Sequence, residues 1–223
     1  MTQKVIIFGF PHSGTSILKS IIGHCDNVEE VINERNTIKN NSDKDFIVCK
    51  YPHTLDSFFT SKYDDYIKIF IIRDPRYVFS SLNKRLNYNL NNIHSIKQYI
   101  KTIKNFSKNL ITPRKDIYCL KYEELFPNNF KVLRDMFDSI GFQYTDKVFD
   151  NSQYENSIHK GSKIPKELPE NKDHLRYRMY QINQPFKNMN DVKKLDLTKE
   201  QLYELEHNEF INVVYPILFE TYY

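Results

Sequence analysis

The sequence predicts an α/β fold in which a central parallel β-sheet is covered by helices on both faces, giving three layers. Apolar runs of strand length alternate with amphipathic segments of helix length from residue 4 to residue 141. This alternation is typical of parallel sheets, whose crossover helices lie on both faces. The first run, residues 5–10, is continuously apolar, as expected for a strand that is buried on both sides.

The expected elements can be placed in order along the chain. The strands are the apolar runs at residues 5–10, 46–49, 66–72 and 116–120. The helices are one ending at Gly23, one opening at Asp74-Pro75, one at 93–110, one stopped by Gly141, and a last one from Thr198 that Pro216 closes or kinks. Several of these boundaries carry a chemical signal, since Asp and Thr cap helix starts, Pro suits the first helical position, and Gly ends helices.

Composition narrows the class of protein. The 32 Lys and Arg residues only slightly exceed the 28 Asp and Glu residues, and no long basic run occurs, so no nucleic-acid partner is expected. The cysteines lack a C-x-x-C spacing and the histidines are scattered, which favours a reduced compartment and no bound metal. The N-terminus enters a strand without a long apolar segment, so we expect a cytoplasmic protein without a membrane anchor. The oligomeric state stays open.

Residues 150–195 break the alternation of strands and helices. They are rich in Asn, Lys and Pro and show weak periodicity, which is typical of a long loop. We expect a mobile or ligand-ordered loop over the active site, so that residues 1–223 form a single domain. Its aromatic residues would then line part of a ligand pocket, with Tyr154, Tyr177, Tyr180 and Phe186 as candidates.

The first strand leads into the stretch GFPHSGTSI, residues 9–17. Gly9 and Gly14 have the spacing of a phosphate-binding loop, G-x-x-x-x-G-K-[ST], but Thr15 stands where that motif has its lysine. The backbone N–H groups, the helix dipole and the hydroxyls of Ser13, Thr15 and Ser16 still suit an anion. We therefore expect the loop to hold a single phosphate of a nucleotide whose transferable group points elsewhere. A chance glycine turn is the alternative.

A second phosphate site is expected in IFIIRDPRYVFSSL, residues 69–82. Arg73 follows a buried strand, at the edge where α/β folds bind ligands. Ser81 lies in the second turn of the following helix, away from its apolar stripe. An arginine can donate two parallel hydrogen bonds to a phosphate, and a serine hydroxyl can add a third. The alternative is a surface ion pair for Arg73 and a solvated Ser81.

Together these segments resemble the sulfotransferase family that uses 3′-phosphoadenosine 5′-phosphosulfate (PAPS) and releases 3′-phosphoadenosine 5′-phosphate (PAP). The family's P-[KR]-[ST]-G-T-[ST] loop stands here as PHSGTS, and its R-[DN]-P-x-x-x-x-x-S segment stands as RDPRYVFSS, in the same order. CLKYEELFPNNFKVLRDMFDSIGF, residues 119–142, resembles the family's strand, Y-E-[DE]-L turn and helix, and HKGS, residues 159–162, resembles its late basic loop. The resemblance covers residues 4–142 and implies a P-loop-type fold.

The resemblance implies a nucleotide site with PAPS as co-substrate and no metal. The 5′-phosphosulfate would lie against the loop residues Pro11, His12, Ser13, Gly14, Thr15 and Ser16. Arg73 and Ser81 would hold the 3′-phosphate. Tyr122 would lie near the adenine, unless its ring is part of the core. Lys160 and Gly161 would close over the 3′-phosphate, with a solvated loop as the alternative.

The resemblance also implies catalytic residues. The family often has Lys or Arg at position 12, where a cation stabilises the charge that develops on the leaving group. His12 does this only when protonated, or more weakly as a neutral donor, so Lys50 is the other candidate. In CKYPHTL, Lys50 matches a family lysine, and His53 lies one residue beyond the place of the family's catalytic histidine, where Pro52 stands. We expect His53 to be the general base.

The predicted activity is transfer of a sulfuryl group from PAPS to a hydroxyl of a small-molecule or carbohydrate acceptor. A carboxylate after the first helix is the rival base, with the candidates Glu29, Glu30 and Glu34. Two other functions stay open. One is a P-loop kinase of a small metabolite, which the missing loop lysine disfavours. The other is a catalytically inactive nucleotide-binding module. Acceptor pockets depend on variable loops, so the sequence leaves the acceptor open.

Overall fold

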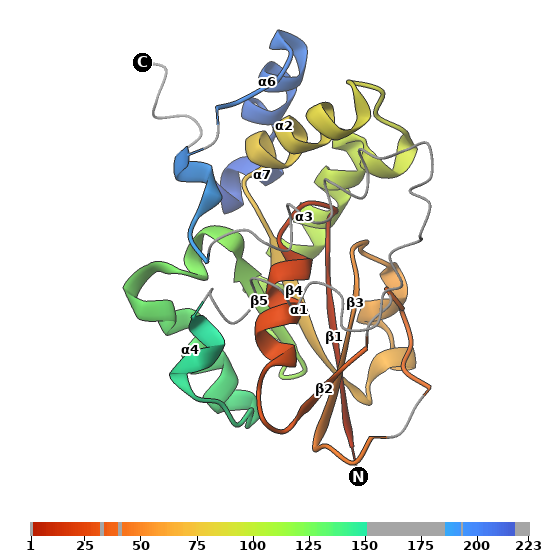
Figure 1. The fold of residues 1–223 in the computed structure, drawn as a ribbon. Coiled ribbons are helices and arrows are strands. Elements are labelled where there is room, and N and C mark those ends of the chain that lie inside the picture. The colour runs from red at the N-terminus through yellow and green to blue at the C-terminus, as the bar shows by residue number, and fades with distance from the viewer. Residues whose placement is uncertain (1, 32–33, 40–41, 151–185, 193, 217–223) are drawn as a thin grey trace, which may run out of the picture.

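The computed structural model describes residues 2–31, 34–39, 42–150, 186–192 and 194–216, and these form a sheet with helices on both faces (Figure 1). The strands of the described chain build one parallel sheet in the order β2-β3-β1-β4-β5. They are β1 (Gln3–Gly9), β2 (Val28–Glu30), β3 (Phe46–Tyr51), β4 (Tyr66–Ile72) and β5 (Ile117–Lys121). The predicted parallel sheet is confirmed, and β2 is an edge strand that the sequence pattern did not indicate.

Two separate apolar cores hold the layers together. On one face, α1 (Thr15–Gly23) and α4 (Pro127–Ile140) pack against a core that includes Val5 and Ile7. The other face includes Ile6 and Phe8 and is covered by α2 (Pro75–Leu86), α3 (Ile96–Ile111), α6 (Lys199–Glu206) and α7 (Glu209–Val214). Successive side chains of a strand point to opposite faces. With both faces covered, β1 is apolar at every one of these positions.

Capping residues fix the helix ends that the sequence predicts. Asp74 Oδ1 accepts a hydrogen bond from the backbone N of Arg76 over 2.9 Å, and Pro75 opens α2. Gly141, with a φ of 92°, ends α4. Thr198 and Gln201 form the predicted capping box of α6.

Two helix boundaries differ from the prediction. Residues 93–110 do not form one helix, because the Ser95 hydroxyl accepts a hydrogen bond from Gln98 N and starts α3 after the 3-10 turn η3 (Asn92–His94). The last helix is divided into α6 and α7, because the Asn208 side chain caps a new helix start.

Residues 128–130 within α4 have left-handed dihedral angles, so its regular part begins after Phe130. The remaining 3-10 turns are η1 (Asp56–Phe59), η2 (Ser61–Tyr63), η4 (Tyr122–Glu124), η5 (Asp146–Phe149) and η7 (Met189–Val192).

The chain after residue 185 returns to the sheet. Met189 in η7 is buried in the same core as α1 and α4. Most of the predicted loop, residues 151–185, lies outside the described residues, and so do Tyr154, Tyr177 and Tyr180. The single domain of residues 1–223 therefore stays a prediction. Within the described parts of the chain, no helix is long and apolar enough to cross a membrane.

Candidate functional site

The carboxyl ends of β1, β3 and β4 meet at one edge of the sheet, and the predicted loop lies there. Gly9 has no room for a side chain, because a Cβ atom would lie 2.0 Å from the Ile71 carbonyl oxygen of β4. Gly14 has a φ of 97°, and a Cβ atom there would lie 2.6 Å from the Tyr122 ring. The two glycines thus allow the loop to pack tightly between β4 and Tyr122 before α1 begins. The first N–H groups of α1 face outward from this turn, which is the usual basis of an anion site.

The loop also contains hydroxyl groups. Ser13 is fully buried, and its Oγ atom has no hydrogen-bond partner within the described part of the chain. Thr15 is 3% exposed at the first position of α1. An unsatisfied buried hydroxyl is costly and marks a place where a ligand or water would be bound. The loop residues that the sequence singles out are therefore brought together as a compact cradle.

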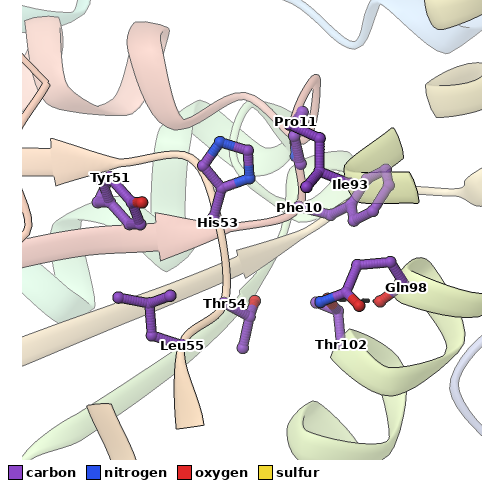
Figure 2. A pocket seen from close by; sticks show the side chains of 9 residues that line it. All are labelled: Phe10, Pro11, Tyr51, His53, Thr54, Leu55, Ile93, Gln98 and Thr102. Atoms are coloured by element: carbon purple, nitrogen blue, oxygen red, sulfur yellow. Dashed lines mark hydrogen bonds between the residues drawn. The ribbon is translucent and has the colours of Figure 1, made fainter. Parts of the chain in front are cut away.

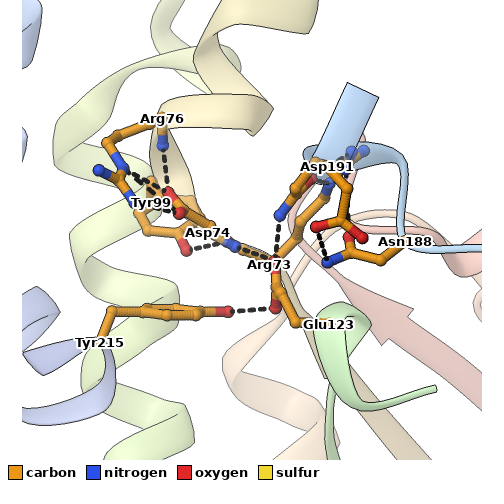
Figure 3. Close-up of polar contacts among 9 residues, drawn as sticks. Arg73, Asp74, Arg76, Tyr99, Glu123, Asn188, Asp191 and Tyr215 are labelled. Atoms are coloured by element: carbon orange, nitrogen blue, oxygen red, sulfur yellow. Dashed lines mark hydrogen bonds and ion pairs between the residues drawn. The ribbon is translucent and has the colours of Figure 1, made fainter. Parts of the chain in front are cut away.

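Arg73 is held at the end of β4 by contacts on three sides (Figure 3). Its Nε and Nη2 atoms donate to Asn190 Oδ1 over 2.8 and 2.6 Å, and its guanidinium lies 4.2 Å from the centre of the Tyr122 ring. Asn190 Nδ2 in turn donates to Glu123 Oε1 over 2.7 Å. The Tyr99 hydroxyl donates to the Arg73 carbonyl oxygen over 2.5 Å. Arg73 is consequently buried and fixed in orientation, and the surface ion pair considered as its alternative is absent from the described contacts.

His12 joins the loop to the Arg73 segment. Its Nδ1 atom lies 2.9 Å from Ser81 Oγ on α2, and its Nε2 atom lies 3.3 Å from Nη1 of Arg85. Arg73 Nη1 also donates to the His12 carbonyl oxygen over 3.4 Å. A guanidinium can only donate, so Nε2 is the acceptor and the proton of a neutral ring lies on Nδ1, toward Ser81. In this arrangement His12 connects the two predicted phosphate sites.

Lys50 brings a cation to the loop from the neighbouring strand. Its Nζ atom donates to Ser16 Oγ over 2.8 Å and to Glu34 Oε1 over 2.7 Å. The side chain is 11% exposed. It lies against the first turn of α1, although the loop has Thr15 at the usual lysine position. The sequence named Lys50 as the alternative cation, and the structure places it beside the loop.

His53 lines a pocket of about 230 Å³ next to the loop residues Phe10 and Pro11 (Figure 2). Burial lowers the pKa of His53 below its ordinary 6.5, and the nearby Glu34 carboxylate offsets part of that shift. The imidazole is therefore mainly neutral at neutral pH, which is the form that accepts a proton. The ring also lies 5.3 Å from that of Tyr51, in an edge contact.

The rival carboxylates have different surroundings. Glu29 is exposed on β2. Glu30 forms an ion pair with the buried Lys19 over 2.7 Å. Glu34 contacts Lys50 and influences the pKa of His53, so it is the carboxylate nearest to the predicted chemistry.

Sequence reasoning missed several residues of the site. Some other residues that it named lie outside the described part of the chain. Asn190 gave no signal because it lies 117 residues from Arg73 in a segment without periodicity. Arg85 had a weak signal, since it follows Ser81 by one helical turn on α2. Lys160 and Gly161 lie outside the described residues. The Tyr122 ring is buried between Gly14 and Arg73, as its core interpretation implied. In the described parts of the chain, no group of three or more His, Cys, Asp or Glu residues is placed to hold a metal ion.

Comparison with known proteins gives a likeness of fold. Retinol dehydratase in complex with androsterone and the inactive cofactor PAP aligns with a TM-score of 0.50 and 10% identity, over 88% of this chain and 82% of that one. The chain has a sulfotransferase-like fold. No family model matches the sequence, and neither does any curated protein.

Two further solved structures show weaker likeness. The sulfotransferase domain from the curacin biosynthetic pathway aligns at a TM-score of 0.48 and 11% identity over 98% of both chains. The mouse sulfotransferase SULT7A1 complexed with PAP aligns at 0.49 and 14% identity, over 69% of this chain and 66% of that one. The chain thus spans just under two thirds of the mouse protein.

Proposed function

We propose that this protein transfers a sulfuryl group from PAPS to a hydroxyl group of an acceptor. The observation that carries the proposal is the contact between His12 and Ser81, which joins the PHSGTS loop to the RDPRYVFSS segment. Two segments that each suit a phosphate thus lie side by side on the adjacent strands β1 and β4. PAP has a phosphate on each side of its ribose, so it has a group for each segment.

The described residues suit the two ends of the nucleotide differently. The N-terminus of α1 and the hydroxyls of Ser13, Thr15 and Ser16 would hold the 5′-phosphate. Arg73 and Ser81 would hold the 3′-phosphate, with Ser81 exchanging its contact with His12 for one with phosphate. Because the Tyr122 ring is covered by Gly14 and Arg73, we infer that it acts by orienting Arg73 rather than by stacking on adenine.

His53 and Lys50 take the chemical roles in this proposal. His53 removes the proton from the acceptor hydroxyl as the oxygen attacks sulfur, and the bond between sulfur and the phosphate oxygen breaks. The electron pair of that bond stays on the 5′-phosphate of PAP. Lys50, which contacts Ser16 at the loop, stabilises the charge that develops there. The neutral state of His53 and the proximity of Lys50 to the loop support these assignments.

Nucleotide binding tests the proposal. Calorimetry should show PAP binding more tightly than 5′-AMP by about ten-fold or more, because AMP lacks the 3′-phosphate and a charge-assisted contact contributes roughly 1.5–3 kcal/mol. Arg73→Ala should remove most of this preference. Arg134→Ala is the matched control, because Arg134 pairs with Asp146 on the opposite side of the sheet from α2.

Two further measurements, the affinity for ATP with Mg²⁺ and the turnover in excess chelator, separate the sulfotransferase from the kinase. A kinase would bind ATP with Mg²⁺ more tightly than PAP, and its turnover would disappear in excess chelator. The proposed sulfotransferase would keep its turnover in chelator. Equal affinities for PAP and AMP would contradict the role given to Arg73 and Ser81.

A further inference from the structure

Three side chains that can donate hydrogen bonds meet at one residue of the loop, His12. Arg73 Nη1 donates to its carbonyl oxygen over 3.4 Å, Ser81 Oγ lies 2.9 Å from its Nδ1 atom, and Arg85 Nη1 lies 3.3 Å from its Nε2 atom. Arg73 and Ser81 are the residues assigned to the 3′-phosphate in the proposed function. Arg85 has no role there, although it contacts the same ring as Ser81.

Ser81 and Arg85 lie on the same face of α2. They are four residues apart, and residues at this spacing are neighbours on the surface of a helix. The RDPRYVFSS segment ends at Ser81, so Arg85 lies beyond the part of α2 that resembles the sulfotransferase family. An anion bound by Ser81 on this face is within reach of the long, exposed side chain of Arg85.

The His12 ring occupies the space between these two side chains. The backbone of His12 has a φ of 68°, in the left-handed region that residues other than glycine seldom adopt, and with this conformation the side chain reaches α2. Arg85 donates to Nε2 of the ring, and a neutral ring donates from Nδ1 to Ser81. Two oxygen atoms of a phosphate have a separation similar to that of the two ring nitrogen atoms. Arg85 and the Ser81 hydroxyl both donate to phosphate oxygens, so a phosphate fits in the place of the ring.

Arg85 also gives this side of the loop a permanent positive charge. The stretch GFPHSGTSI contains no Lys or Arg, and His12 is a cation only when it is protonated. A guanidinium stays charged and presents its donors in a rigid plane that suits phosphate. Burial lowers the pKa of His94 in η3, and the positive charge of Arg85 lowers it further. Arg85 thus supplies, from α2, a cation that this stretch of the loop lacks.

We propose that Arg85 is a third residue that binds the 3′-phosphate, together with Arg73 and Ser81. The inference rests on the sulfuryl transfer proposed above. When PAP binds, its 3′-phosphate displaces the His12 ring from between Ser81 and Arg85. The exchange is favourable, because hydrogen bonds from a guanidinium and a hydroxyl to a charged phosphate are stronger than those to a neutral imidazole.

Calorimetric titration with PAP and with 5′-AMP tests this contact, because AMP has no 3′-phosphate. Arg85→Ala should lower the ratio of the PAP affinity to the AMP affinity by about five-fold or more, the effect of losing a charge-assisted hydrogen bond at an exposed site. The AMP affinity itself should be unchanged. Lys84→Ala is the matched control, because it removes one positive charge from the neighbouring exposed position of α2, and it should keep the ratio.

The His12→Gly background separates a direct contact from an effect that passes through His12. Glycine adopts a φ of 68° without strain, and it removes the ring. If Arg85 contacts the phosphate itself, Arg85→Ala should lower the ratio in this background by about the same factor as in the parent protein. If Arg85 acts only by holding the His12 ring, Arg85→Ala will have no effect in this background, and the inference is wrong.

The outcomes distinguish this inference from the proposed function. If Arg73→Ala removes the preference for PAP while Arg85→Ala leaves it intact, the inference is wrong and the proposed function stands. The same holds if Arg85→Ala weakens the binding of PAP and AMP equally, or if Lys84→Ala lowers the ratio as much as Arg85→Ala does. If the parent protein binds PAP and AMP equally, the proposed function is wrong, and the role of Arg85 falls with it.

Discussion

The Nζ atom of Lys50 donates a hydrogen bond to Oγ of Ser16, over 2.8 Å, and so places a cation from β3 against the first turn of α1. The loop has Thr15 at the position where nucleotide triphosphatases have their lysine. In this protein the cation comes from the neighbouring strand instead. This relationship separates the two residues that the sequence offered for charge stabilisation, because His12 contacts Ser81 and Arg85 rather than Ser16.

Lys50→Met should lower kcat by about 10²–10³-fold, the usual loss when one donor that stabilises transition-state charge is removed. Its affinity for PAP should change much less, since the α1 N-terminus and the loop hydroxyls remain. His12→Gln should have a smaller effect on kcat, because an amide can still contact Ser81. Steady-state kinetics with PAPS and a hydroxyl acceptor measure both variants. A larger loss for His12→Gln than for Lys50→Met would return the electrostatic role to His12.

The pH dependence of turnover should show His53 as a base with a low pKa. Burial lowers the pKa of His53 below 6.5, so the neutral, proton-accepting form is present above the lowered pKa and is lost as the pH falls through it. The acidic limb of the kcat profile should therefore lie below pH 6.5. Its midpoint should move to still lower pH in Glu34→Gln, because the Glu34 carboxylate raises the pKa of His53.

His53→Ala should lower kcat by about 10²–10⁴-fold, which is the contribution expected of a general base. PAP affinity, measured by calorimetry, should be little changed. If His53→Ala keeps near-normal turnover while Glu34→Gln abolishes it, Glu34 is the base. His207→Ala, which alters an exposed histidine at the end of α6, is the control.

Gly14→Ala should destabilise the fold as well as the site. The new Cβ atom would lie 2.6 Å from the Tyr122 ring, and the backbone φ of 97° is unfavourable for alanine. We expect a loss of about 2–4 kcal/mol in the free energy of unfolding, from strain and overpacking together. Urea unfolding followed by circular dichroism measures it, with Ser20→Ala on α1 as the control. An unchanged midpoint for Gly14→Ala would show that Tyr122 moves aside freely.

The parts of the fold that the sequence predicts are those with strong local signals. The run at 66–72 is apolar except for Lys68 and became β4 with the same bounds, and Asp74-Pro75 caps α2 as expected. β2 could not be recognised, because it has three residues and two of them are Glu. Glu30 is tolerated there because it pairs with Lys19, an interaction between two elements that no local pattern reveals.

Within the site, too, residues with a local sequence signal were predicted, and contacts between distant segments were not. The loop and the Arg73 segment were predicted because each combines a strand end, a helix start and a recognisable spacing. The position of Lys50 was predicted as an alternative only, since its contact with Ser16 depends on the pairing of β3 with β1. The contact between Arg73 and Asn190 depends on how the chain returns to the sheet after residue 185, which the sequence does not specify.

Asn190 should control how well Arg73 recognises a 3′-phosphate. Its Oδ1 atom accepts hydrogen bonds from both Nε and Nη2 of Arg73, and its amide nitrogen is held by Glu123. In Asn190→Asp a carboxylate would replace the amide oxygen, pair with Arg73 and repel both Glu123 and the incoming phosphate. We expect PAP affinity to fall by about ten-fold or more, in line with the roughly 1.5–3 kcal/mol of a hydrogen bond to a charged group. AMP affinity should stay nearly constant, because AMP has no 3′-phosphate.

Asn190→Ala distinguishes orientation from competition. Without the amide oxygen, Arg73 loses two fixed contacts but stays near the Tyr122 ring, so PAP affinity should fall less than in Asn190→Asp. Asn188→Asp, which changes a more exposed residue of the same segment, provides the control for added charge. Calorimetric titration of each variant with PAP and with AMP gives the ratio of affinities. If Asn190→Ala binds PAP more tightly than the parent protein does, Asn190 competes with the phosphate for Arg73 instead of positioning it.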